Sequence, residues 1–290
     1  MTRGKSLARR QAGELRLSSK PEQFLFRKLI SAVLLAMSIA AHAEAQVQDT
    51  ILKKTSLLTG KDALLVGAFT LGTVAVAPLD RQVAKRLQNP GTQENRFLKR
   101  AATGFRVLAV PGSVLAGVGL YALGRADGQR RVQALGLHSV ESILLASALG
   151  GGIKFAAGRA RPYVDIDNPH DFQLFRGISD DKYRSFPSGH TINAFAFAST
   201  VTRETQFWWP HSVWYVGTVM YGGATLMGLS RIYNNQHWAS DVMGGAAIGT
   251  LIGLKVVKYT HSHPGNHIDS QLIKGKNSQR SIPIAFSFQF

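Results

Sequence analysis

The sequence contains no cysteine among its 290 residues. This absence excludes thiolate catalysis, disulfide bonds and zinc sites built on cysteine. Acidic residues are also scarce, since 17 Asp and Glu stand against 34 Lys and Arg, which gives a formal net charge of +17 at pH 7. Such an excess of positive charge predicts an anionic partner: a nucleic acid, a phospholipid surface or a phosphorylated small molecule.

Two sequence patterns are missing as well. No basic run is interleaved with aromatic residues, which argues against a nucleic-acid-binding protein. The long apolar stretches lack the strict polar–apolar alternation of strands, and they are longer than ordinary strands. We therefore expect an all-α fold, a bundle of about six helices with the functional site at one end. The six apolar stretches run over about 63–79, 107–124, 142–157, 191–202, 211–229 and 242–257.

The N-terminus has the parts of a secretory signal peptide. Arg27 and Lys28 precede an apolar run over 29–41, and small-x-small sequences follow it. This run is short for a membrane span, and an uncleaved anchor is the alternative. The predicted division is a leader with signal peptide over 1–45, a linker over 46–61, a helical domain over 62–260, and a polar tail over 261–290 whose alternating phenylalanines predict a short terminal strand.

The sequence leaves open whether the helices cross a membrane. A crossing needs about 20 mostly apolar residues, and only 63–79, 107–124 and 211–229 approach that length. Residues 80–106 hold seven Lys and Arg against two acids, so the positive-inside rule would place them in the cytoplasm. With an exported leader and three crossings, Lys154 would lie there too. A soluble or peripherally attached domain avoids that conflict.

Three polar clusters carry the functional prediction, because a phosphate ester needs fixed positive charge, a nucleophile and a proton for its leaving group. The first cluster holds Lys154 and Arg161, followed by Pro162. Seven residues are nearly two helical turns, so both cations should project from one helix face, with the helix ending near Arg161. A basic helix end that only complements the helix dipole is the alternative.

The second cluster is Ser188-Gly189-His190, at the predicted start of the fourth helix. The unpaired N–H groups of a helix N-terminus bind anions, and Gly189 allows the backbone to approach a ligand closely. His190 would lie beside the anion, where an imidazole delivers a proton near neutral pH. An ordinary serine cap beside an incidental histidine would give the same sequence.

The third cluster contains Arg231, His237 and Asp241. His237 and Asp241 are four residues apart, so on a helix they share a face and can form a hydrogen bond. A carboxylate on one imidazole nitrogen fixes the tautomer and leaves the other nitrogen as a nucleophile, while Arg231 adds a guanidinium. A solvated His–Asp surface pair is the alternative.

Together the clusters read Lys-x6-Arg-Pro, Pro-Ser-Gly-His and Ser-Arg-x5-His-x3-Asp. In this order they resemble the signature of the type 2 phosphatidic acid phosphatase superfamily, which also contains bacterial nonspecific acid phosphatases and vanadium haloperoxidases. The match covers residues 154–241, with all eight polar signature positions present. The resemblance implies that His237 is the nucleophile that forms a phosphohistidine, that Asp241 orients it and that His190 is the general acid. By the same resemblance, the phosphoryl oxygens would be held without a metal ion or other cofactor by Lys154, Arg161, Ser188, Gly189 and Arg231.

The resemblance and the apolar helices predict a metal-independent phosphatase acting on a lipid phosphomonoester or diphosphate, such as phosphatidate, a polyprenyl diphosphate or a lipid A phosphate. The expected location is the bacterial cell envelope, in the inner membrane or periplasm, with the site facing the periplasm. The alternatives are a soluble periplasmic acid phosphatase of broad specificity, a vanadate-dependent haloperoxidase, and a non-enzymatic helical membrane protein.

The remaining polar and aromatic residues give weaker signals. The loop over 163–186 should pass the mouth of the site and influence selectivity. Its His170-Asp171 and Asp180-Asp181 pairs could bind a metal, although a solvated loop is the simpler interpretation. The histidines near the end of the last apolar stretch, His261 and His263, are assigned to the tail without a role; Trp208, Trp209 and Trp238 fit either packing or a membrane interface.

Overall fold

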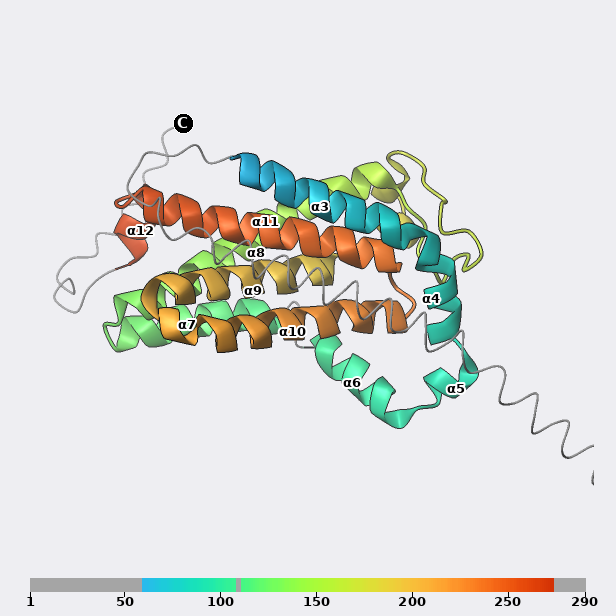
Figure 1. Cartoon of the computed structure of the whole chain (residues 1–290), viewed down its shortest axis with the longest axis horizontal. Coiled ribbons are helices and arrows are strands. Elements are labelled where there is room, and N and C mark those ends of the chain that lie inside the picture. Colours follow the sequence, from blue (N-terminus) through green and yellow to red (C-terminus); the bar gives the residue numbers. More distant parts are fainter. Residues whose placement is uncertain (1–58, 108–110, 274–290) are drawn as a thin grey trace, which may run out of the picture. The chain divides into compact units, whose positions relative to one another are not determined.

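The computed structural model describes residues 59–107 and 111–273 (Figure 1). The predicted signal peptide, most of the predicted linker and the predicted terminal strand lie outside these residues. All described residues belong to one compact unit. Within the described ranges the chain is helical, with a single isolated bridge between Arg159 and Phe172. The predicted all-α class is confirmed.

Each of the six apolar stretches forms a helix. The chain also forms short helices that hydrophobicity alone does not indicate: α4 (Asp80–Leu87), α5 (Pro90–Gln93), α6 (Arg96–Val107) and α12 (His267–Leu272). The helices that match the predicted stretches are α3 (Gly60–Val76), α7 (Ser113–Ala126), α8 (Arg130–Ala157), α9 (Gly189–Trp208), α10 (Val213–Tyr233) and α11 (Ala239–Ser262).

Helix α9 is the central element of the bundle. It packs against α8, α10 and α11, while α3 lies on α11 and α7 pairs with α8 (Figure 1). Glycines bring α9 and α11 together: a Cβ at Gly249 would lie 2.3 Å from the carbonyl oxygen of Ile192, and one at Gly253 would lie 2.0 Å from the hydroxyl of Ser199. Because these separations leave no room for a side chain, the two backbones approach closely.

Helix α9 is rich in hydroxyl residues and nevertheless buried. The hydroxyls of Ser199, Thr202 and Thr205 each donate to the carbonyl four residues earlier, at 2.7 Å. This local bonding satisfies polar groups that would otherwise be costly to bury. The moderate hydrophobicity of the fourth predicted stretch therefore reflects an interior position and not a surface helix.

Among the residues that the structure describes, three segments are long and apolar enough to cross a membrane: Gly60–Leu87, Arg130–Ala157 and Ala239–Ser262. Large apolar side chains on them are exposed, among them Leu64 and Leu71, which are 75% and 71% exposed. Such exposure is typical of a surface that faces lipid. Of the three stretches expected to approach span length, 63–79 lies in one of these segments, and 211–229 forms a helix of 21 residues that is not among them. Helix α7, in the stretch 107–124, has only 14 residues. The stretch 142–157 does lie in a segment of span length, because α8 begins twelve residues before it.

The predicted tail is not wholly separate from the bundle. Helix α11 continues to Ser262, so His261 belongs to it. Helix α12 then lies against the domain: the hydroxyl of Tyr121 donates to the carbonyl of Leu272 at 3.0 Å, and Asp269 lies 3.2 Å from His138. The assignment of His261 to the tail is therefore corrected, because it lies in α11.

Candidate active site

The eight predicted residues converge at one end of the bundle. Lys154 lies on the last turn of α8, Ser188 to His190 begin α9, Arg231 ends α10, and Asp241 lies in the first turn of α11. The Cε atom of Lys154 would be 3.6 Å from a Cβ at Gly189. The positive charges of Arg231, Lys154 and Arg161 all act on His190, and those of Lys154 and Arg161 act on His237. The structure thus brings the three sequence clusters together.

The path of the chain between Lys154 and Arg161 differs from the prediction. Helix α8 ends at Ala157, because Gly158 adopts a left-handed conformation with φ of 56°. A Cβ at Gly158 would lie 1.9 Å from the carbonyl oxygen of Gln173, so both the turn and the packing require glycine there. Lys154 and Arg161 therefore do not share a helix face. Arg161 approaches the site from the following loop.

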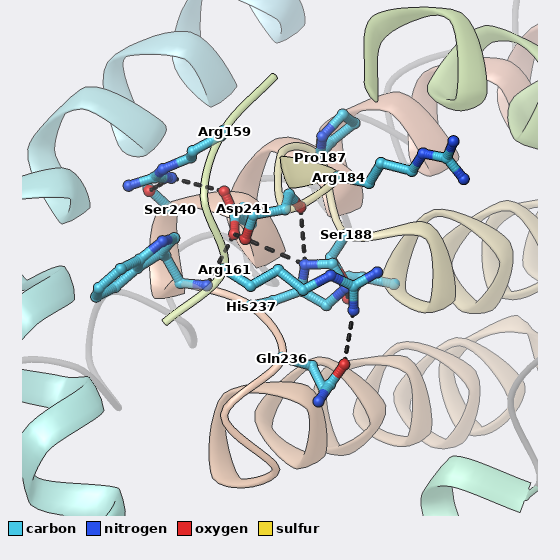
Figure 2. A network of polar contacts seen from close by, with 12 residues as sticks. Arg159, Arg161, Arg184, Pro187, Ser188, Gln236, His237, Ser240 and Asp241 are labelled. Atoms are coloured by element: carbon cyan, nitrogen blue, oxygen red, sulfur yellow. Dashed lines mark hydrogen bonds and ion pairs between the residues drawn. The ribbon is translucent and has the colours of Figure 1, made fainter. Parts of the chain in front are cut away.

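Two of the cations bind protein oxygens in this structure. The Nζ of Lys154 donates to the carbonyls of Arg184 and Pro187 at 2.9 and 2.6 Å. The guanidinium of Arg161 donates to the side chain of Gln236 at 2.6 Å (Figure 2). It also donates to the Asp181 carboxylate at 2.8 Å. Asp181, one of the loop carboxylates considered for metal binding, thus pairs with Arg161. Asp171, another loop carboxylate considered for metal binding, forms an ion pair with Arg176 at 2.8 Å.

Arg231 has no such partners. Its side chain is 6% exposed, and its Nε and Nη1 atoms are buried without a hydrogen-bond acceptor. Unsatisfied donors of a charged group are costly to bury, so their presence indicates a binding site whose ligand supplies the hydrogen-bond acceptor. The position beside His190 makes an anion the natural acceptor.

The N-terminus of α9 contributes backbone donors. Ser188 is its N-cap, as predicted, and the first turn leaves N–H groups that no helical carbonyl accepts. The backbone N–H of Ser188 itself donates to the carbonyl of Asp241 at 3.0 Å, and its hydroxyl accepts from Thr191 at 2.8 Å. This fixes the start of α9 against α11 and leaves Gly189 and the next residue to face a ligand.

His237 is held in a defined tautomer. Its Nδ1 lies 2.7 Å from the backbone carbonyl of Ser185, which accepts only if Nδ1 carries the proton (Figure 2). The Nε2 atom is then unprotonated and available as a nucleophile. Burial lowers the pKa of His237 to about 3, with the charges of Lys154 and Arg161 acting in the same direction and Asp241 opposing them. The imidazole is therefore neutral at physiological pH.

The predicted hydrogen bond from His237 to Asp241 is replaced by a longer contact. The Nδ1 and Oδ2 atoms are 3.7 Å apart, beyond hydrogen-bond distance. Asp241 is instead fixed by Arg159 at 2.6 Å, by the hydroxyl of Ser185 at 2.5 Å and by the backbone N–H of Trp238 at 2.8 Å. Asp241 therefore positions the Ser185 segment, and the carbonyl of that segment orients His237.

Arg159 and Asp80 are residues that the sequence motifs do not identify. Arg159 is 2% exposed and donates to Asp241 (Figure 2). It also donates to the carboxylate of Asp80 at 2.8 Å, so it joins the two acids. Asp80 also accepts from the backbone of Ser240 at 2.8 Å. Arg159 lies over the ring of Trp238, which is fully buried, so that tryptophan serves packing and not a membrane interface. The only sequence signal was the position of Arg159 inside the first basic cluster.

His190 differs from His237 in its surroundings. Burial lowers its pKa to about 4, and the charges of Arg231, Lys154 and Arg161 contribute to the shift. The positive potential that lowers this pKa is the potential that attracts an anion. A bound phosphate would offset it, which raises the pKa of His190 when substrate is present.

A cluster of cations around two imidazoles at the end of a helical bundle has the architecture of an oxyanion-binding protein. Residues 135–263 match the sequence model of the PAP2 superfamily. The predicted family resemblance is confirmed.

Curated relatives carry names of lipid phosphatases. A lipid A 1-phosphatase of Porphyromonas gingivalis is 40% identical over 113 residues, which are 38% of this chain and 21% of that protein. An undecaprenyl-diphosphatase of Sulfolobus acidocaldarius is 28% identical over 143 residues, which are 49% of this chain and 64% of that protein. The matched part of this chain thus spans between about a fifth and two thirds of these relatives. A crystal structure of a transmembrane PAP2-type phosphatidylglycerolphosphate phosphatase from Bacillus subtilis has a TM-score of 0.49 at 21% identity, covering 69% of this chain and 96% of that one.

Proposed function

We propose that this protein is a metal-independent phosphatase that hydrolyses a lipid phosphomonoester or diphosphate through a phosphohistidine intermediate. The observation that carries the proposal is the buried guanidinium of Arg231, whose Nε and Nη1 have no acceptor, beside the two imidazoles. The match to the PAP2 superfamily and the names of the relatives, lipid A 1-phosphatase and undecaprenyl-diphosphatase, support a lipid phosphate as substrate.

The proposed reaction begins with attack by Nε2 of His237 on phosphorus. The P–O bond to the leaving group breaks, and His190 donates a proton to the departing oxygen. Water then attacks the phosphohistidine while His190 accepts its proton, and inorganic phosphate leaves. Throughout, the phosphoryl oxygens are bound by the side chains of Lys154, Arg161, Ser188 and Arg231 and by the backbone N–H of Gly189.

The oxyanion donors act by preorganisation. Arg161 and Lys154 already bind protein acceptors that fix their positions, so little reorganisation is needed when phosphate displaces those contacts. Arg231 gains the acceptors it lacks. The carboxylate of Asp241 does not touch the substrate; it holds the Ser185 carbonyl that sets the His237 tautomer.

The apolar side chains exposed on the candidate spans support a lipid substrate. A domain with such a surface is expected to contact lipid, which favours an amphiphilic substrate over a soluble ester. A soluble periplasmic acid phosphatase is the second candidate, favoured by the predicted leader. We place the protein in the bacterial envelope with its site facing the periplasm.

Replacement of His237 tests the proposal. His237→Ala should lower kcat on p-nitrophenyl phosphate and on lipid phosphates by about 10³-fold or more, because the nucleophile is lost. The matched control is His211→Ala, an exposed histidine of the loop before α10, which should retain wild-type rates. Unchanged hydrolysis by His237→Ala excludes the phosphohistidine mechanism. A wild-type preference for soluble over lipid substrates would support the second candidate.

A further inference from the structure

A second polar cluster lies at the opposite end of the same helices. It consists of His138 on α8, Glu204 on α9 and His261 on α11, with one donor atom of each within 4.8 Å of the others. Glu204 is 0% exposed. His190 and Glu204 are fourteen residues apart on α9, which corresponds to about 21 Å along the helix axis. The proposed phosphatase chemistry therefore makes no use of these residues.

The three donor groups point at one small volume. Nδ1 of His138 is 2.6 Å from Oε1 of Glu204, and Nε2 of His261 is 3.1 Å from Oε2 of the same carboxylate. A tetrahedral Zn²⁺ with bonds of about 2.0–2.2 Å holds its ligand atoms about 3.3 Å apart. The contacts of 2.6 and 3.1 Å are shorter than this separation, and the donor atoms of the cluster lie within 4.8 Å of one another, so the three side chains must shift apart around an ion to admit it. Two imidazoles and one carboxylate are also a known zinc donor set.

The outer contacts are those that support metal ligands. Nε2 of His138 faces the Asp269 carboxylate at 3.2 Å, which leaves Nδ1 to bind an ion. Asp269 is itself fixed by a hydrogen bond, because its backbone N–H donates to the side-chain oxygen of Asn266 at 3.0 Å. Glu204 accepts from Nε1 of Trp208 at 2.7 Å, and the His261 ring is stacked on Phe207 with centroids 4.0 Å apart. Each donor therefore has a fixed orientation.

The charges of the cluster leave room for a cation. Glu141 follows His138 by three residues on α8, so it lies on the same helix face, and its Oε1 is buried without a hydrogen-bond partner. Glu141, Glu204 and Asp269 are three carboxylates around two imidazoles. Burying an excess of carboxylates is costly unless they are paired or coordinate a metal. A divalent ion would balance this charge.

We propose that His138, Glu204 and His261 bind a divalent transition-metal ion, with Zn²⁺ as the best match. Asp269 orients His138, and Glu141 or a water completes the coordination. The ion would join α8, α9 and α11 at the end of the bundle remote from the phosphate site, which is a structural role. The side chains of His261 and Asp269 are 15% and 17% exposed, which provides a route of entry.

Metal titration of the purified full-length protein in detergent tests this site. After treatment with a chelator, Zn²⁺, Mn²⁺ and Fe²⁺ are titrated separately by calorimetry, and bound metal is measured by mass spectrometry after dialysis. We expect one ion per chain and a rise in unfolding temperature on binding. His261→Gln should abolish both effects. Asp269→Asn should weaken binding about 10- to 100-fold, because it removes only the orienting contact.

His263→Gln is the matched control, since this exposed histidine lies two residues from His261 and outside the cluster. It should bind metal like the wild type. Circular dichroism before metal addition establishes that each variant is folded. If His261→Gln fails to fold, the metal affinity of Asp269→Asn relative to the wild type decides whether the site exists. Absence of stoichiometric binding in the wild type, or equal affinity in wild type, His261→Gln and Asp269→Asn, overturns the proposal and leaves a metal-free His–carboxylate network. These readouts do not depend on phosphatase activity.

Discussion

At the scale of single residues, Arg159 is the group on which the geometry of the site depends most. It is the shared partner of two fully buried carboxylates, Asp80 and Asp241. Removing one member of a buried ionic network leaves the charges of the others uncompensated, which costs about 3–5 kcal/mol in the free energy of unfolding. We therefore expect Arg159→Met to lower the free energy of unfolding by about that amount and to lower kcat, since Asp241 would lose its anchor. Equilibrium unfolding in detergent measures the first effect.

The control for Arg159 is Arg81→Ala. Arg81 pairs with Asp167 at the surface, where the two side chains are 54% and 56% exposed, so its removal should cost about 0–1 kcal/mol. If both substitutions cost the same, the buried network does not stabilise the fold as argued.

The two imidazoles of the site predict the pH dependence of stability. Their pKa values in the folded protein, about 3 for His237 and about 4 for His190, lie below the ordinary value of 6.5. As pH falls, these two imidazoles therefore take up protons at a higher pH in the unfolded chain than in the folded protein. The contribution of these two imidazoles to stability is fully present above pH 6.5 and declines as pH falls from there towards 4, by up to about 1.4 kcal/mol per pH unit for each imidazole. Unfolding temperatures between pH 7.5 and 4.5 measure this decline.

Glutamine at position 237 separates this effect from general acid denaturation. His237→Gln cannot take up a proton, so its stability should fall less steeply with decreasing pH than that of the wild type. Parallel pH profiles of the two proteins would contradict the assignment of a neutral, buried His237.

At the scale of elements, the contact between α9 and α11 positions both histidines, because each lies at or just before the start of one of these helices. Gly249→Ala would press a methyl group onto the backbone of α9, with the Ile192 carbonyl at 2.3 Å and the Ala196 nitrogen at 2.8 Å. We expect a loss of about 1–3 kcal/mol in the free energy of unfolding and a lower kcat, because α9 and α11 must move apart. Thermal unfolding and initial rates measure both.

Gly222→Ala on α10 is the corresponding control. No atom lies within 4 Å of a Cβ at Gly222, so alanine there should stabilise the helix by about 0.5–1 kcal/mol. A Gly249→Ala protein as stable as Gly222→Ala would show that the close helix approach is not required.

At the scale of the whole molecule, the absence of cysteine makes the orientation in the membrane measurable. Ile178 is 62% exposed in the loop beside the site, where its carbonyl accepts from Arg184, and His267 begins α12 at the other end of the bundle. A single cysteine at Ile178 should react with an impermeant maleimide from the periplasmic side. One at His267 should react only after the inner membrane is permeabilised.

Reversed labelling would place the site in the cytoplasm. The basic segment 80–106 lies at the same end as the site, since Asp80 binds Arg159 and Arg106 acts on His190, so the proposed periplasmic site requires an exception to the positive-inside rule. Labelling of both cysteines without permeabilisation, with release of the protein by osmotic shock, would instead identify the soluble phosphatase.

The sequence by itself determined the six helices of the apolar stretches and indicated the eight residues proposed for the site. Runs of apolar residues report which segments are buried or lie in lipid, because that depends on each residue's own side chain, and all six predicted helices formed. Motif order indicated the eight polar residues before any geometry was known.

Tertiary structure alone decided how those residues are connected. The end of α8 depends on the Gly158 turn that packs on residue 173, and the anchor of Asp241 comes from Arg159, which is 82 residues away in sequence. His138 and Glu204 meet across 66 residues. Local patterns carry no information on such pairs, because the distance between two side chains far apart in the chain is set by how the helices pack.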